Sequence, residues 1–203
     1  KDVEKLKSTW KIENNKKIIL LPGRLTAWKG QEMFIEAINL FSLNNPELDF
    51  VAVILGDDQG RTVYRKKLER LVEQFKLTKK IKFVDNCDVM PVAYYISDAV
   101  VSSSIEPEAF GRVSVEAQAM GKPIIASDLG GSKETILKGK SGFLYKYDDP
   151  RQLAKNLNNI IELDEVSLHS MGNEGRKNIS KKFDVEAMCD STFREYKKML
   201  NVQ

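Results

Sequence analysis

The sequence predicts one doubly wound α/β domain, with a parallel sheet of about six strands in residues 16–147 and a helical tail over about 149–200. Three observations predict it. Short runs of β-branched and apolar residues alternate with longer segments of helical periodicity as far as Tyr145. After Tyr145 only helical patterns follow, and no Pro/Gly/Ser-rich linker divides the chain, so we expect a single domain over residues 1–203.

The strands are predicted from short apolar runs that end at turn-forming or polar residues. Their expected ranges are 17–21, 49–55, 81–84, 99–102, 123–126 and 142–145.

Two helices between these strands are predicted from apolar residues spaced three and four apart. The helix at 31–44 would bury Met33, Phe34, Ala37, Ile38 and Phe41, and the helix at 62–75 would bury Val63, Leu68, Leu71, Val72 and Phe75. In the tail we expect helices at 149–163, 169–182 and 184–199, with Asp149 and Asp184 placed as N-caps.

Composition narrows the functional class. Hydrophobic residues make up 42% and charged residues 30%, which is typical of a globular protein. The net charge of +3 comes from 32 basic and 29 acidic residues, too even a balance to indicate a nucleic-acid partner.

The cysteines, the apolar runs and the first residues indicate the cellular compartment and whether the chain is part of a longer protein. Cys87 and Cys189 fit no metal or redox spacing, so we expect free thiols in a reducing, cytoplasmic setting. The apolar runs are far shorter than the roughly 20 residues that cross a bilayer. Because Lys1 is not an initiator methionine and no secretory signal follows it, we expect a fragment of a longer protein.

Ligands of open α/β sheets bind beyond the carboxyl ends of the strands, so the loops there carry the functional prediction. The loop after the first strand holds Arg24 and Lys29 and leads into a helix. Two cations and a helix N-terminus favour an anion such as phosphate, although simple exposure of both side chains explains them equally well.

The segment after the fourth strand is the most informative. Gly111 allows close backbone approach to a ligand, and the next amides open a helix whose N-terminus could hold a diphosphate. Glu116, one turn into that helix, could accept hydrogen bonds from the vicinal hydroxyls of a ribose. Glu108 would lie nearer to whatever the diphosphate carries. Both acids could instead simply favour a helix N-terminus electrostatically.

These residues resemble the signature of the glycosyl transferases group 1 family, retaining enzymes of GT-B architecture, in the Glu-x7-Glu spacing of Glu108 and Glu116 around Phe110-Gly111. Further motifs follow the family's order along the chain. They are Gly23-Arg24-Leu25 with Lys29-Gly30, Leu55-Gly56-Asp57, residues 116–128, Gly130-Gly131 with Glu134, and residues 141–144. The resemblance implies a Rossmann-like, nucleotide-sugar-binding C-terminal domain, one half of a GT-B fold.

Residue by residue, the resemblance implies that Arg24 and Lys29 bind the diphosphate of a UDP-sugar or GDP-sugar donor. Gly111, Arg112 and Val113, after Phe110, would offer it backbone amides. Glu116 would hold the ribose and Glu108 would contact the donor sugar. The base would lie near Cys87, in a loop where the family usually has glycine at the position of Asp85 or Asn86, and the Arg112 side chain could point away from the ligand.

The function expected from this resemblance is transfer of a hexose to an acceptor hydroxyl with retention, in surface polysaccharide or lipopolysaccharide biosynthesis. We expect no cofactor and no metal, because no Asp-x-Asp motif is present. The resemblance also implies a missing N-terminal acceptor domain as partner, with the full enzyme at the inner face of the cell membrane. The isolated domain would then transfer almost nothing.

Two alternatives stay open. The chain could be a nucleotide-sugar-binding module without transferase activity. It could also belong to a related two-domain enzyme such as an epimerase or an inverting transferase, against which the acidic pair argues only by resemblance.

Overall fold

The structure is a computed structural model, and it describes residues 1–200. Six strands form one parallel sheet in the order β3-β2-β1-β4-β5-β6. The doubly wound α/β prediction is thereby confirmed. The strands are β1 (Lys17–Pro22), β2 (Phe50–Leu55), β3 (Ile81–Val84), β4 (Ala99–Ser102), β5 (Ile124–Ser127) and β6 (Gly142–Tyr145).

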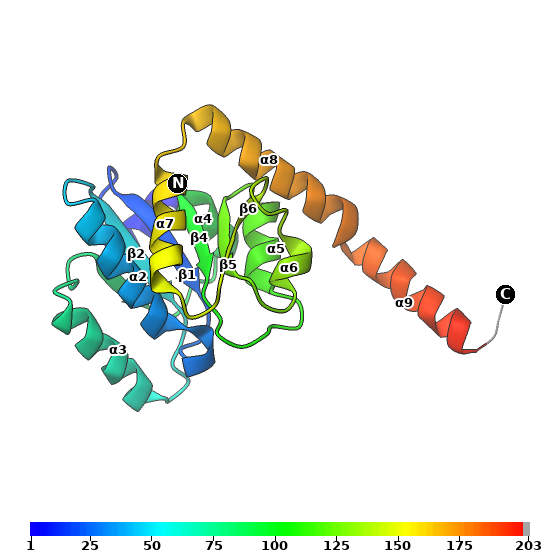
Figure 1. Ribbon diagram of the computed structural model, residues 1–203, viewed down its shortest axis with the longest axis horizontal. Coiled ribbons are helices and arrows are strands. Elements are labelled where there is room, and N and C mark those ends of the chain that lie inside the picture. The colour runs from blue at the N-terminus through cyan, green and yellow to red at the C-terminus, as the bar shows by residue number, and fades with distance from the viewer. Residues whose placement is uncertain (201–203) are drawn as a thin grey trace.

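Helices cover both faces of this sheet, because the strands are apolar on both sides. On one face lie α2 (Gln31–Asn44), α3 (Thr62–Gln74) and α7 (Pro150–Ile161), and on the other lie α1 (Asp2–Thr9), α4 (Met90–Ile96) and α5 (Arg112–Ala119) (Figure 1). The short α6 (Ser132–Thr135) and the long α8 (Glu165–Lys182) pack beside α5. Among residues 1–200, no helix is long and apolar enough to cross a membrane.

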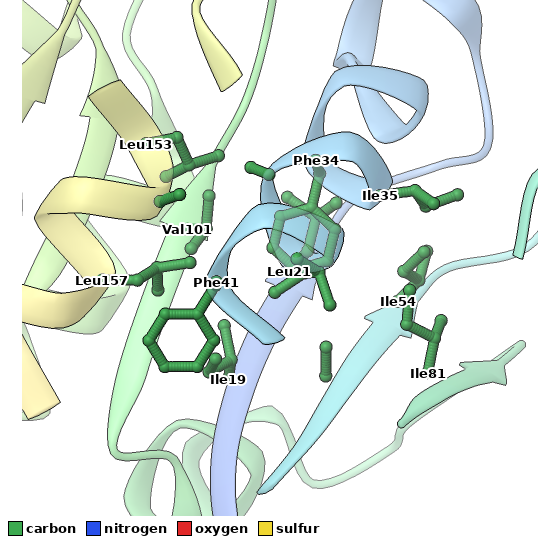
Figure 2. Close-up of a cluster of buried hydrophobic side chains, with 14 of the residues drawn as sticks. Ile19, Leu21, Phe34, Ile35, Phe41, Ile54, Ile81, Val101, Leu153 and Leu157 are labelled. Carbon is green, nitrogen blue, oxygen red and sulfur yellow. The ribbon is translucent and has the colours of Figure 1, made fainter. Parts of the chain in front are cut away.

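The core between β1 and the first of these layers is formed as the periodicity predicts. Phe34 and Phe41 of α2 point onto Ile19 and Leu21 of β1, and Leu157 of α7 closes the same cluster (Figure 2). The rings of Phe41 and Phe50 meet edge to face with centroids 5.0 Å apart. Burial of such side chains stabilises the fold by roughly 1.5–3 kcal/mol each.

The structure corrects the predicted helix pattern at several places. Val63 lies at the start of α3 and is 83% exposed, so it does not join the core face with Leu68 and Val72. The helices α1, α4 and α6 were not predicted from the sequence, and the second tail helix begins at Glu165 rather than His169.

The predicted N-caps are present. Asp149 accepts a hydrogen bond from the Gln152 amide at the start of α7, and Asp184 accepts one from the Ala187 amide at the start of α9 (Val185–Met199). Asp164 caps α8 in the same way through the Ser167 amide, and this bond lowers the pKa of its carboxyl. Local sequence thus sets where these helices start.

The last helix differs from the others because none of its residues is buried. It projects away from the sheet and its covering helices (Figure 1). Its exposed apolar residues include Val185, Met188, Phe193, Tyr196 and Met199, and Leu200 follows at its end. The predicted domain end at 203 lies outside the described residues.

Candidate donor-binding cleft

A cleft of about 660 Å³ opens at the carboxyl ends of the strands. Its walls come from the loops after β1 and β4, the two strands between which the strand order reverses. Ligands of doubly wound sheets bind at this point because the adjacent loops diverge to opposite faces. The cleft brings together all nine residues that the sequence analysis placed in the site: Arg24, Lys29, Cys87, Glu108, Phe110, Gly111, Arg112, Val113 and Glu116.

The loop after β1 is held by its neighbours on both sides. The Leu25 amide donates to the Asp57 carbonyl at 3.0 Å, and the Gln31 side chain donates to the Arg24 carbonyl at 2.9 Å. Gly56 packs so closely on this loop that a Cβ there would lie 2.1 Å from the Gly23 carbonyl oxygen. The Arg24 side chain remains exposed, and within residues 1–200 it forms no ion pair.

Lys29 and Glu108, which the sequence analysis gave separate roles, are in direct contact. Lys29 Nζ lies 2.7 Å from Glu108 Oε1, and both side chains are 15% exposed. Ser104 Oγ donates a hydrogen bond to the same oxygen. The ammonium also lies 4.4 Å from the centre of the Trp28 ring. Before any ligand binds, this cation therefore already has a carboxylate partner.

The backbone around Glu108 is braced by the glycine pair of the segment after β5. The Gly131 amide donates to the Glu108 carbonyl at 2.8 Å. A Cβ at Gly130 would lie 2.3 Å from that carbonyl oxygen, and one at Gly131 would lie 2.4 Å from the Phe110 carbonyl oxygen. Only a residue without a side chain allows this approach, which explains the glycine pair of the motif in structural terms.

The turn that follows presents a helix N-terminus to the cleft. Gly111 has a φ of 79° and is the N-cap of α5. The first hydrogen bond of the helix runs from the Ser114 amide to the Gly111 carbonyl at 3.0 Å. The amides of Arg112 and Val113 come before it and are free to donate to an anion. Phe110 is 43% exposed and its ring packs against Phe183.

Glu116 lies one turn further along α5, with a different partner on each oxygen. Tyr94 Oη donates to Oε2 at 2.7 Å, and Arg112 donates to Oε1 through Nη2 at 2.9 Å. Burial, reinforced by the bond to Glu116, raises the pKa of Tyr94 well above its ordinary value. The hydroxyl therefore stays protonated and is the donor. The Arg112 side chain is 83% exposed and folds back along its own helix onto Glu116.

Tyr94 was not among the predicted site residues because α4 was not predicted. The available signals were Pro91 in the first turn of this helix and the apolar Ala93-Tyr94 pair, but neither indicates a contact with Glu116. The contact of Ser104 with Glu108 was not predicted either.

The loop after β3 forms the far wall of the cleft with Asp85, Asn86 and Cys87. Asp85 is ion-paired with Arg65 of α3. Cys87 is partly buried, and both it and Cys189 are free thiols, as predicted.

Within the described chain no group of three or more histidine, cysteine, aspartate or glutamate side chains is arranged to hold a metal ion. That donor binding needs no divalent cation stays a prediction.

Many solved structures resemble this fold, among them three glycosyltransferase structures. A glycosyltransferase from Rickettsia africae ESF-5 superimposes with a TM-score of 0.91 at 30% identity, covering 100% of this chain and 52% of its own. HepE of Anabaena in complex with UDP-glucose gives 0.86 at 29% identity, with coverages of 97% and 52%. The C-terminal domain of a glycosyl transferase group 1 family protein from Francisella tularensis gives 0.76 at 28% identity, with coverages of 88% and 93%.

The chain spans half or less of the length of the curated relatives that it matches. The family model described as "Glycosyl transferases group 1" matches residues 2–178, which include the sheet, both glutamates and the loops of the cleft. The chain belongs to the glycosyl transferases group 1 family.

Proposed function

We propose that this chain is the donor-binding domain of a glycosyltransferase that transfers a hexose from a UDP-sugar to an acceptor hydroxyl with retention. One observation carries the proposal: a single cleft at the switch point of the sheet gathers both glutamates, both cations and a free helix N-terminus. The UDP-glucose complex of the Anabaena neighbour supports UDP rather than GDP as the nucleotide.

In this proposal the diphosphate lies between the loop after β1 and the N-terminus of α5. The Arg112 and Val113 amides and the positive end of the helix would face its oxygens. Arg24 and Lys29 would neutralise the charge that grows on the leaving UDP as the bond from the sugar to the diphosphate breaks. Lys29 would reach the diphosphate from its position beside Glu108.

The remaining parts of the donor follow from this placement. Glu116 would accept hydrogen bonds from the ribose hydroxyls, and the base would lie against the wall near Cys87. Glu108, on the opposite side of the Phe110-Gly111 turn, would contact the hexose. The sugar would then occupy the part of the cleft nearest the Lys29–Glu108 pair.

We further propose that the acceptor-binding half is a separate N-terminal domain, so that this domain alone transfers almost nothing. The half-length coverage of the relatives supports this division, and so does the apolar face of α9, which nothing in the described chain covers. The whole enzyme would act at the cytoplasmic face of the membrane, in surface polysaccharide or lipopolysaccharide synthesis.

A nucleotide-sugar-binding module without transferase activity is the second candidate, and the half-length coverage favours it too. Both candidates require the cleft to bind UDP. They separate only when transfer is measured in the full protein.

Calorimetric titration of the chain with UDP tests the shared requirement. Because Glu116 would accept charge-assisted hydrogen bonds from two hydroxyls, Glu116→Ala should weaken UDP binding roughly 10- to 100-fold. Glu106→Ala is the matched control, since Glu106 is exposed and does not line the cleft, and it should bind as the wild type does. A wild-type chain that binds neither UDP nor GDP would overturn the assignment of the cleft.

A further inference from the structure

We propose that Tyr94 is a positioning residue for ribose recognition, which fixes the Glu116 carboxylate so that its Oε1 oxygen faces the nucleotide. This inference rests on the proposed role of Glu116 as the ribose ligand. It adds a residue that is outside the recognised motifs and comes from a helix that the sequence did not predict.

The Tyr94 ring cannot move to follow a mobile carboxylate. The residue is 2% exposed and lies in the core cluster between α4, α5 and the sheet, among Ala93, Val100 and Ala117. Tyr94 is one of the residues that line the cleft, and its hydroxyl donates to Glu116 Oε2 at 2.7 Å. Since the ring is fixed and the hydroxyl stays protonated, the flexible Glu116 side chain must adapt to it.

Arg112, the other partner of Glu116, has the opposite properties. Its side chain is largely exposed and is attached to the same helix four residues before Glu116. Exposed pairs at this spacing contribute little to stability, because solvent screens them. A ribose can therefore displace the guanidinium from Oε1, whereas the buried phenol keeps its bond to Oε2.

Holding the carboxylate in advance favours binding because a free glutamate side chain loses rotamer entropy when it is ordered. Because Tyr94 holds the carboxylate in the folded domain, this entropy is already lost before the nucleotide binds. A nucleotide with ribose hydroxyls then meets a carboxylate that already points toward it, and a nucleotide without them gains nothing from this order.

The test compares UDP with 2′,3′-dideoxy-UDP by calorimetry on the whole chain. Tyr94→Phe keeps the buried ring and removes only the hydroxyl. It should weaken UDP binding about three- to tenfold and change dideoxy-UDP binding less than twofold. Tyr95→Phe is the control, because Tyr95 is the next residue of α4, is exposed and makes no hydrogen bond to Glu116. It should bind both ligands as the wild type does.

A second comparison does not depend on the dideoxy ligand. In the Glu116→Ala background, adding Tyr94→Phe should change UDP affinity less than twofold, because the hydroxyl acts only through the carboxylate. Thermal unfolding of each variant verifies that the domain is folded at the temperature of titration.

The outcomes separate this inference from the proposed function. If Tyr94→Phe binds UDP normally, or weakens both nucleotides equally, Tyr94 is not a positioning residue, yet the assignment of the cleft stands. If the wild-type chain does not bind UDP, or Glu116→Ala binds it unchanged, the role of Glu116 fails and the role of Tyr94 fails with it.

Discussion

The two glutamates of the signature are held in place by different means. The backbone at Glu108 is braced by Gly130 and Gly131, and its carboxylate oxygen Oε1 accepts from both Lys29 and Ser104. The backbone of Glu116 is ordinary helix, and its two oxygens have separate partners in Tyr94 and Arg112. The Glu108 side chain is 15% exposed and that of Glu116 is 36% exposed.

The two glutamates of one motif are therefore held by different kinds of contact. The position of Glu108 depends on backbone atoms in close contact, so it should be sensitive to any added side-chain volume nearby. The position of Glu116 depends on side-chain hydrogen bonds, so it should respond to the loss of single polar groups. Three substitutions separate these two dependences.

Gly130→Ala should have the largest effect. Gly130 has a φ of 50°, and an added Cβ would lie 2.3 Å from the Glu108 carbonyl oxygen and 2.8 Å from its amide nitrogen. Left-handed strain of about 1–2 kcal/mol and a backbone clash of about 1–3 kcal/mol should together lower the free energy of unfolding by roughly 2–5 kcal/mol. Urea unfolding measures this loss.

Gly139→Ala is the matched control for that substitution. Gly139 also has a positive φ, of 76°, but an added Cβ would meet nothing within 4 Å. Only the strain of about 1–2 kcal/mol should therefore remain. Equal losses for the two alanine variants would show that the contact between Gly130 and the Glu108 backbone contributes nothing.

Glu108→Gln should have the next largest effect, on the sugar rather than on the nucleotide. If Glu108 contacts the hexose, the variant should bind UDP-glucose about three- to tenfold more weakly, because a charge-assisted hydrogen bond is lost. UDP binding should not weaken, since Lys29 loses a competing carboxylate. Competition titrations with the two ligands measure both affinities, and Glu106→Gln provides the control. A parallel loss for UDP and UDP-glucose would place Glu108 at the nucleotide instead.

Much of the fold could be predicted because its signals are local. The six strands lie within one residue of their expected ends, since each is a short, mostly apolar run closed by a polar or turn residue, and β1, β2, β4 and β5 are almost wholly buried. Asp149 and Asp184 predicted where their helices begin because an N-cap side chain bonds to amides only two or three residues away. Val63 was misplaced because it lies five residues before Leu68, off the stripe that Tyr64, Leu68 and Val72 form at intervals of four.

The candidate site, like the fold, could be predicted only in part. Nine residues could be assigned to one cleft because parallel strands bring their carboxyl ends to one edge, and because the motif resembles a known family. The contacts between side chains could not be predicted. Lys29 meets Glu108 across 79 positions of the chain and Tyr94 meets Glu116 across 22, and no local pattern specifies either distance.

Arg112→Ala should have the smallest effect, and it sharpens the account of Glu116. The guanidinium donates to Oε1 from an exposed position on the same helix, so its loss should change UDP affinity less than about threefold and stability by no more than about 0.5 kcal/mol.

The direction of the change in UDP affinity shows what the Arg112 side chain does when the donor binds. A modest gain in affinity means that Arg112 competes with the ribose for Oε1, which agrees with the exposed position of its side chain. A loss of tenfold or more would mean that the side chain turns to the diphosphate when the donor binds, and Arg112 would then join Arg24 and Lys29 among the cations that neutralise it. Calorimetric measurement of UDP affinity at low and high salt separates competition for Oε1 from contact with the diphosphate, because only the contact with the diphosphate is weakened strongly by salt.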